Sequence, residues 1–445
     1  MKKAIEWLVG VAIIAVVAPL IFFVACSDEE EEEIKIVEIS TREELYAMES
    51  DKGYILTADI DLGGGEWKPL SVKSFDGNGH TIENGVIKEN YSDDYGAKPS
   101  AAFFYGTQVS NVAFKEIIVS AINAELAAIA VAGYGDVSNV TLEDCRINYT
   151  YNVEAEKWYD TDEICIGLVS SGYNKFFNCT VRSCSLTVAK AAVALQAGFI
   201  CGRDFEAVDS CTVEDCDMTI ANAENVYIGG LVGLSKAYNN VIKNCSVKNN
   251  RFKVENSGYT MFGGLCSYAG EDEDGEFVFN KVTGNNVEIK TDDYCCGGLF
   301  GGVQGKISDC LVSNNIISAR ASDEEDVTKR LAGAIGYCVE SATVRNCVVQ
   351  NCSLDGDGVM VGFIGDARGS VVSCAVRNNQ LTGDAFARER DNIAKSYIFH
   401  NGDGEIDNVN KLPTLNEEEW KEIIAKLEMK DCWSVNSAGE LVLSI

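Results

Sequence analysis

The stretch Gly229–Phe252, GGLVGLSKAYNNVIKNCSVKNNRF, contains the two patterns that specify the fold. The first is a glycine-flanked apolar segment, Gly230-Leu231-Val232-Gly233, and the second is a pair of short segments that begin at Cys245 and Asn250. In each short segment apolar and polar residues alternate, as in a strand with one buried face. The alternation shifts by one residue between the two segments, and we expect a turn there that keeps both apolar faces on the same side.

Both patterns recur along the chain. The Gly-rich segment returns at Gly298-Leu299-Phe300-Gly301, Gly333-Ala334-Ile335-Gly336 and Gly362-Phe363-Ile364-Gly365, with looser copies at Gly167, Gly198 and Gly264. The first position of the second pattern is Val112, Val140, Cys179, Cys211, Cys245, Asn280, Cys310, Cys347 and Cys374, and its second segment begins at Ile117, Cys145, Cys184, Cys216, Asn250, Asn285, Asn315, Cys352 and Asn379. The eight intervals between these first positions average about 33 residues, a period typical of solenoids.

Three short strands per repeat, with no helical periodicity between them, predict an all-β fold: a parallel β-helix of about nine coils. The buried column shared by cysteine and asparagine then becomes a ladder, in which asparagine side chains hydrogen-bond from coil to coil and cysteine fills the same small space. One polar position of each coil points outward, and this outward column contains Lys115, Glu143, Arg182, Glu214, Lys248 and Arg377.

The 18 cysteines follow this repeat. Pairs such as Cys179 and Cys184 are five positions apart, unlike the close C-x-x-C spacing of zinc sites, and sister repeats replace them with valine, isoleucine or asparagine. We therefore expect structural core thiols, with disulfides between coils and metal ligation as the alternatives. In the vicinal pair Cys295-Cys296, one side chain should face inward and the other outward, where it would be reactive.

The ends of the chain differ from the repeats. Ser40-Thr41-Arg42-Glu43-Glu44 predicts a capping box that opens a short helix, and Thr414-Leu415-Asn416-Glu417 opens a second helix. A hairpin around Asn436-Ser437-Ala438-Gly439 is expected to close the chain. The predicted organisation is a signal peptide at 1–25, an acidic tether at 26–36, an N-terminal cap with the first strands at 37–100, β-helix repeats at 101–395, and a C-terminal helix and hairpin cap at 396–445.

The N-terminal residues predict where the protein resides. Two lysines precede an apolar run from Trp7 to Ala25, which ends at Phe23-Val24-Ala25-Cys26. This end resembles the lipobox of bacterial lipoproteins, which implies cleavage before Cys26 and lipidation (palmitate) of Cys26; an uncleaved membrane anchor is the alternative. The acidic run that follows resembles the export signal of Bacteroidetes-type surface lipoproteins. We expect a protein anchored by lipid in the outer membrane and exposed at the cell surface.

The segments ILTADIDLGGGEWKPL (residues 55–70) and FDGNGHTI (residues 75–82), followed by the G-G-L-V-G and N-C-x-V strands, resemble the GLUG-motif proteins. These are bacterial surface and secreted proteins, many of them described as adhesin-like. The resemblance implies a right-handed parallel β-helix over roughly residues 50–385. It implies no catalytic residues, since the motif consists of glycine and apolar positions that build coils.

Composition narrows the range of functions. A net charge of −31, from 37 Lys+Arg against 68 Asp+Glu, argues against a nucleic-acid partner. With His80 and His400 as the two histidines, a Ser-His-Asp triad or a histidine-based metal site is disfavoured. We expect no cofactor and no metal site. Acidic loops at 271–274, 323–326 and 401–405 are candidates for Ca²⁺, but none has EF-hand spacing, so solvated loops are the simpler interpretation.

One loop is a candidate ligand platform. Tyr149, Tyr151, Trp158 and Tyr159 lie beside Glu154, Glu156 and Asp160, a combination that can stack on sugar rings. The alternative is that these rings fix the loop to the helix. The leading hypothesis is a non-catalytic binding, adhesion or structural module whose partner is a glycan or a host or cell-surface protein. The alternative is a polysaccharide lyase or glycoside hydrolase on the same scaffold, for which Glu143 and Glu214 of the outward column would be candidates.

Overall fold

The structure is a computed structural model. It describes residues 34–88, 99–151, 163–172, 174–191, 193–255, 258–322, 329–382, 387, 393–394, 397–399, 433–436 and 440–444. The chain divides into two compact units, Met1–Ile36 and Val37–Ile445. Among the residues given above, no helix is long and apolar enough to cross a membrane.

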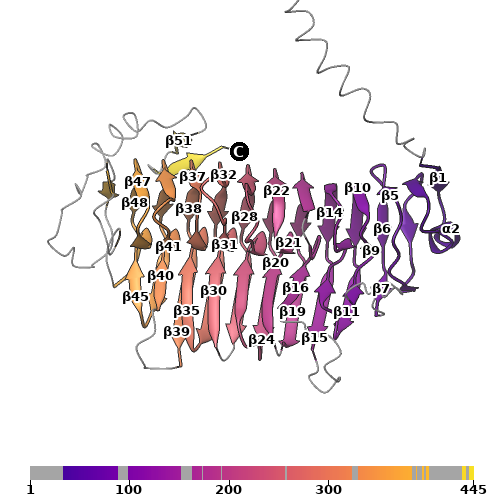
Figure 1. The fold of residues 1–445 in the computed structure, drawn as a ribbon, viewed down its shortest axis with the longest axis horizontal. Coiled ribbons are helices and arrows are strands. Elements are labelled where there is room, and N and C mark those ends of the chain that lie inside the picture. Colours follow the sequence, from indigo (N-terminus) through magenta and orange to yellow (C-terminus); the bar gives the residue numbers. More distant parts are fainter. Residues whose placement is uncertain are drawn as a thin grey trace, which may run out of the picture. The chain divides into compact units, whose positions relative to one another are not determined.

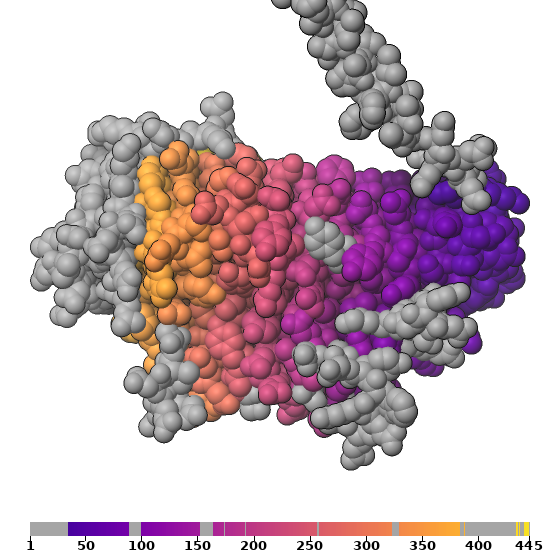
Figure 2. Space-filling model, viewed as in Figure 1, coloured from indigo at the N-terminus to yellow at the C-terminus, as the bar shows by residue number. Residues whose placement is uncertain are grey.

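The second unit is a parallel β-helix, as the repeats predict. One coil runs through β22 (Phe205–Asp209), β23 (Thr212–Glu214), β24 (Asp217–Ala221), β25 (Val226–Gly229) and β26 (Val232–Leu234) before β27 (Val241–Lys243) opens the next. Each strand pairs in parallel with its counterpart one coil further on, so successive coils lie side by side in chain order (Figure 1). The sequence colours accordingly follow one another as bands across the surface (Figure 2).

The prediction of three strands per repeat is wrong, because a complete coil such as this one contains five. The Gly-rich segment supplies two of them, β25 and β26, since the chain bends at Gly230 and Leu231. A further strand, β22, precedes the position occupied by Cys211. The alternation in this strand is too short to stand out from the variable loop before it.

Four rows of strands run through the coils, and we name them sheets A to D. Sheet A contains β1 (Ile36–Ile39), β2 (Gly53–Leu56), β3 (Ile60–Asp61), β5 (Ser74–Asp76), β6 (Thr81–Glu83), β10 (Gln108–Lys115), β14 (Val137–Glu143), β17 (Asn174–Phe177), β18 (Thr180–Arg182), β22, β23, β27, β28 (Ser246–Lys248), β32 (Glu276–Val278), β33 (Lys281–Thr283), β37 (Lys306–Ser308), β38 (Leu311–Ser313), β42 (Thr343–Arg345), β43 (Val348–Gln350), β47 (Ser370–Val372), β48 (Ala375–Arg377), β49 (Ile393–Ala394) and β50 (Tyr397–Phe399). Sheet B contains β4 (Glu66–Trp67), β7 (Val86–Ile87), β11 (Ile118–Ile122), β15 (Arg146–Thr150), β19 (Ser185–Lys190), β24, β29 (Arg251–Glu255), β34 (Asn286–Thr291), β39 (Ile316–Ala321) and β44 (Ser353–Gly356).

The other two rows are formed by the Gly-rich segments. Sheet D contains β8 (Ser100–Ala101), β12 (Leu126–Ala127), β16 (Glu163–Gly167), β20 (Ala194–Gly198), β25, β30 (Tyr259–Gly263), β35 (Asp293–Gly297), β40 (Arg330–Ala332) and β45 (Val359–Val361). Sheet C contains β21 (Cys201–Arg203), β26, β31 (Cys266–Ala269), β36 (Phe300–Val303), β41 (Ile335–Cys338) and β46 (Ile364–Ala367), with the pair β9 (Phe104–Tyr105) and β13 (Val131–Ala132) in the same row at its N-terminal end.

The register predicted from the repeat alignment is confirmed in sheet A. Its inward column pairs Phe114, Leu142, Val181, Val213, Val247, Val282, Val312, Val349 and Val376 in that order. The nine predicted repeats are therefore nine stacked levels. Among the described residues the stack also extends beyond them, with two earlier levels at β2/β3 and β5/β6 and one later level at β49/β50. The strands within 37–100 thus already belong to the β-helix.

The one-residue shift between the short strands is a left-handed bend. Asn244, which precedes Cys245, has φ 57°, and Asn249, which precedes Asn250, has φ 56°. The same bend recurs in other coils, mostly at asparagine, aspartate and serine and also at Glu116, Phe279 and Gly284; asparagine and aspartate are the non-glycine residues that tolerate this backbone region best. The bend turns the next side chain into the core and keeps both strands facing inward.

The cysteine and asparagine column is a buried hydrogen-bond ladder. Asn285 Oδ1 accepts from the backbone N–H of Asn250 at 2.8 Å and from its Nδ2 at 3.0 Å, and Asn315 Oδ1 accepts from Asn285 in the same way. A cysteine in this column donates its thiol to the carbonyl that an asparagine amide would reach, as Cys216 Sγ does to Val181 O at 3.7 Å. The ladder predicted from the sequence is confirmed.

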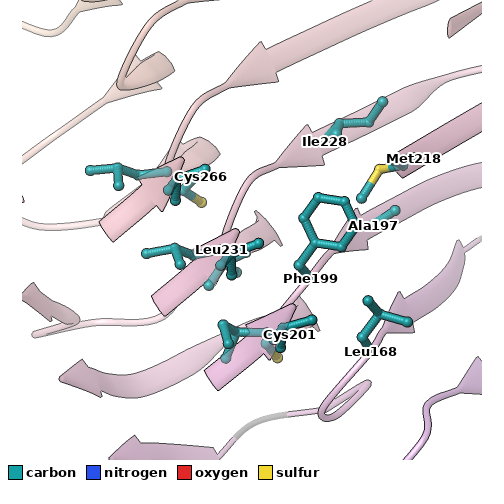
Figure 3. Packing of buried hydrophobic residues seen from close by; sticks show 14 of the residues in the cluster. Leu168, Ala197, Phe199, Cys201, Met218, Ile228, Leu231 and Cys266 are labelled. Carbon is teal, nitrogen blue, oxygen red and sulfur yellow. The ribbon is translucent and has the colours of Figure 1, made fainter. Parts of the chain in front are cut away.

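The core consists of inward side chains from all four sheets. Phe199, Met218, Ala197 and Ile228 come from different strands or turns and converge in one place, with Leu231 nearby (Figure 3). Glycine is required where coils approach too closely for any side chain. A Cβ on Gly298 would lie 2.1 Å from Gly333 O, and the same contact recurs at the corresponding glycines along the column.

The predicted N-terminal helix is present as α2 (Arg42–Tyr46). Thr41 is its N-cap, and Glu44 completes the capping box by accepting from the backbone N–H of Thr41 at 3.1 Å. Leu45 anchors the helix because it is fully buried. The second predicted helix, at 414–427, lies outside the described residues.

The C-terminal hairpin is formed by β51 (Trp433–Val435) and β52 (Leu441–Leu443). It packs on the outward face of sheet A, where the side chain of Gln350 donates to Leu441 O at 2.8 Å and accepts from Leu441 N at 3.2 Å. The hairpin is thus a lateral cover. Arg377, expected in the exposed outward column, is 5% exposed and sits one level beyond Gln350 in that column.

Candidate functional site

Tyr149 does not belong to an exposed ligand platform. It is 1% exposed on β15, and its hydroxyl donates to Ala124 O at 2.6 Å. Burial raises the pKa of this phenol. Tyr151, directly after the strand, is half-buried and packs against the core cluster. These two rings therefore take the packing role that was the alternative in the sequence.

The remaining residues of that platform, Trp158 and Tyr159, lie outside the described residues, as do Cys26 and the acidic loops at 323–326 and 401–405. In the acidic loop at 271–274, Asp274 is 3.1 Å from Lys306 Nζ, and Asp272 accepts from the backbone N–H of Asn239 at 3.3 Å. Within the described part of the chain, no group of three or more His, Cys, Asp or Glu side chains could hold a metal ion.

The 16 cysteines that the structure describes are buried and form no disulfide. Most of them donate to backbone carbonyls, as Cys216 Sγ does to Glu214 O at 3.1 Å. Burial raises the pKa of Cys296 and Cys310, and it raises that of Cys352 to about 11. A protonated thiol is a poor nucleophile and a poor metal ligand, so Cys296, Cys310 and Cys352 have a structural role.

One thiol of the pair Cys295-Cys296 was expected to face solvent, and this expectation is wrong. Cys295 is 2% exposed although it belongs to the outward face of β35 and lies outside the central cluster. Its thiol donates to Gly301 O at 3.2 Å, and a Cβ on Gly336 would lie 2.6 Å from its sulfur. Sheet C therefore covers the outward face of sheet D, because the chain bends between them. Burial raises the pKa of Cys295 to about 12.

The carboxylates of the outward column are held in ion pairs. Glu143 Oε2 is 3.2 Å from Arg182 Nη2, and Glu214 Oε2 is 3.9 Å from Lys248 Nζ. The partners are neighbours in the column because the coils stack in register. This arrangement neutralises the two carboxylates that the enzymatic alternative would require.

Partly exposed tyrosines gather where the outward faces of sheets C and D meet. We call Tyr227, Tyr259, Tyr268 and Tyr337 the tyrosine face. The rings of Tyr227 and Tyr259 lie 6.3 Å apart at 61°, and those of Tyr268 and Tyr337 lie 6.2 Å apart at 33°. Burial raises the pKa of all four phenols, so the rings are neutral and remain hydrogen-bonding groups.

Gly302 brings Tyr268 and Tyr337 together. It stands between them in the register of sheet C, and the two tyrosines are two coils apart. A Cβ at Gly302 would lie 2.9 Å from Tyr268 Cδ2 and 2.5 Å from Tyr337 Cε1. Without a side chain at this position, both rings can lean over the strand and form a continuous aromatic surface.

A pocket of about 490 Å³ adjoins this surface, and we call it the Asp366 pocket. Tyr337, Arg330, Arg368 and Glu340 are among the residues that line it with Asp366. Arg330 lies over the ring of Tyr337 at 5.8 Å from its centroid, a cation–π contact. Asp366 Oδ2 is 3.5 Å from Arg330 Nη2 and 3.2 Å from Arg368 Nη2.

This site was not predicted from the sequence. Tyr268, Tyr337 and Asp366 each occupy the position directly after the last residue of a Gly-rich four-residue segment, and Gly302 does so in the copy between the two tyrosines. This column was therefore visible in the repeat alignment. What the alignment lacked was the division of each Gly-rich segment into two strands, which decides which residues face outward.

The chain was also compared with known proteins. No protein-family model matches it, and no curated protein matches it. Among solved structures it is similar to PfbA, a surface adhesin of Streptococcus pneumoniae, with 12% sequence identity and a TM-score of 0.38 over 86% of this chain and 90% of that one.

Proposed function

We propose that this protein is a lipid-anchored surface protein of the outer membrane that binds glycans or cell-surface proteins and does not convert them chemically. The observation that carries the binding role is the tyrosine face, where four partly exposed rings gather on two adjoining sheets. Aromatic rings with free edges and hydroxyl groups are frequent in recognition surfaces because they combine apolar area with hydrogen bonding.

The scaffold supports a binding role. A β-helix presents side chains at coil spacing of roughly 4.8 Å, so an extended polymer can contact several coils in succession. The outward carboxylates Glu143 and Glu214 are neutralised by cations, which favours recognition over hydrolysis. The resemblance of the repeats to GLUG-motif proteins, many of them adhesin-like, points to the same role.

The anchoring part of the proposal rests on Cys26 and its flanking sequence. Cleavage before Cys26 would leave an N-terminal cysteine for lipidation, and the acidic residues after it would act as an extended tether, because like charges repel. The tether would hold the β-helix away from the membrane surface. A lipid anchor of this kind gives membrane attachment without a spanning segment.

The experiment uses bacterial cells that produce the full chain or its Cys26→Ala variant. We expect the parent protein in the outer-membrane fraction, a lipid-modified N-terminal peptide by mass spectrometry, and digestion by protease added to intact cells. The variant should lose the lipid. Binding of cells to immobilised glycans and host proteins tests recognition. Turnover of a polysaccharide by the purified protein, abolished by one carboxylate substitution, would refute the binding role.

A further inference from the structure

The structure assigns the Asp366 pocket as a binding site for a neutral pyranose unit of an oligosaccharide, with the ring stacked on Tyr337 and two neighbouring hydroxyl groups held by Asp366 and its arginine partners. This assignment rests on the proposed function. It adds the location of the binding site and the class of ligand.

Asp366 is a buried carboxylate with one oxygen that has no donor. The residue is 8% exposed, and both arginine contacts reach the same oxygen, Oδ2. The other oxygen, Oδ1, is buried and has no hydrogen-bond donor among the described residues. A buried carboxylate oxygen without a donor is costly in free energy. Because this carboxylate lines the pocket, a rotation that turns Oδ1 toward the pocket would let a ligand hydroxyl donate to it and recover that free energy.

The donors and acceptors of the pocket match those of a sugar. An ionised carboxylate only accepts hydrogen bonds and a guanidinium only donates them, whereas a hydroxyl does both. Adjacent hydroxyl groups of a sugar can therefore donate to Asp366 Oδ1 and accept from Arg330 or Arg368. Bonds that involve charged groups are the stronger ones. An anionic ligand would supply acceptors for the arginines but no donor for Asp366.

An aromatic surface lies beside the carboxylate. Tyr337 lines the pocket and Tyr268 lies next to it over Gly302, so the C–H face of a pyranose can stack on Tyr337 while its hydroxyl groups reach Asp366. The tyrosine face continues to Tyr259 and Tyr227 on neighbouring coils, which provides room for further sugar units of the same chain. The site is thus suited to an oligosaccharide more than to a single sugar.

The test uses the full chain and hexasaccharides of glucose, mannose and galactose, with a hexasaccharide of galacturonate as the anionic arm. Affinity is measured by calorimetry for the parent and for Asp366→Asn, Tyr337→Ala and Tyr337→Phe. We expect at least one neutral hexasaccharide to bind, with affinity falling at least tenfold in Asp366→Asn and Tyr337→Ala. It should be retained within about twofold in Tyr337→Phe, which keeps the ring.

Tyr134→Ala is the matched control, since Tyr134 is 75% exposed and lies on a turn distant in sequence from the pocket. It should leave affinity unchanged. Thermal midpoints of all variants are recorded, and a lowered midpoint in Tyr337→Ala that is absent from Tyr337→Phe would identify loss of ring packing. Binding that is insensitive to both Asp366→Asn and Tyr337→Ala would overturn this site while leaving the proposed function intact. Absence of binding to every neutral hexasaccharide, or tighter binding of galacturonate, would overturn the ligand class.

Discussion

The asparagine ladder gives the sharpest test of how this fold is stabilised. Replacing Asn285 by alanine removes the acceptor for the backbone N–H and the Nδ2 of Asn250 and the donor to Val247 O, the last at 3.2 Å. Three hydrogen bonds at about 1 kcal/mol each, plus about 1 kcal/mol for the stranded N–H of Asn250, give a loss of about 4 kcal/mol in the free energy of unfolding. Asn250 Nδ2 keeps a second acceptor, Val213 O, and adds no further cost.

Two other variants test whether the lost ladder hydrogen bonds cause this loss of stability. Asn285→Cys should cost less, about 2 kcal/mol, because a thiol in this column can donate to the coil before it and accept a backbone N–H, as Cys184 Sγ does from Cys145 N at 3.4 Å. Asn286→Ala is the matched control, since that neighbouring side chain is exposed, and its effect should stay within about 0.5 kcal/mol.

The assay is unfolding in urea followed by circular dichroism, with hydrogen exchange to locate the weakened coils. In a solenoid each coil contacts only its neighbours, so Asn285→Ala should lower protection most in the coils that contain Asn250, Asn285 and Asn315. A midpoint for Asn285→Ala equal to that of Asn286→Ala would show that the ladder adds no stability. Equal losses in Asn285→Ala and Asn285→Cys would show that cysteine does not replace asparagine in the ladder.

Three further outcomes are expected from the described contacts. Gly298→Ala should destabilise the protein by about 1–3 kcal/mol, measured by urea unfolding, because its Cβ would lie 2.1 Å from Gly333 O; a loss below about 1 kcal/mol would show that the coils can move apart. Cys295 should resist iodoacetamide near pH 8 in the native protein and react after unfolding, because burial raises the pKa of its thiol to about 12 and it stays protonated. Native labelling, mapped by mass spectrometry, would contradict that assignment. Arg182→Ala should cost less than about 1 kcal/mol, and the loss should shrink in high salt, because its 3.2 Å contact with Glu143 is half exposed; a larger, salt-independent loss would indicate a packing role.

The hairpin that covers sheet A shows where reasoning from repeats ends. Arg377 occupies the same column as Glu143, and by sequence alone both are outward. The structure leaves Glu143 accessible and buries Arg377, at 5% exposure, in the part of sheet A where Leu441 of β52 hydrogen-bonds to Gln350. The residues that form this cover come from the end of the chain, and no periodicity connects them to the coil on which they pack.

The stacking register of this protein could be predicted from its sequence alone. Alternation within each short strand and a period near 33 residues suffice, because a solenoid coil contacts only the coils before and after it. The ladder of asparagine and cysteine follows from the same alternation and period.

Which outward positions are accessible, and which of them meet, was settled by the packing of the folded chain. The bend at the Gly-rich segments lays sheet C against sheet D, which buries Cys295 and brings Tyr268, Tyr337 and Asp366 to one surface. In the same way, Tyr149 was expected to contact a ligand but is buried, with its hydroxyl bonded to Ala124 O. These outcomes depend on the angle between sheets and on contacts between distant segments, and neither is encoded in the alternation of a strand or the length of a repeat.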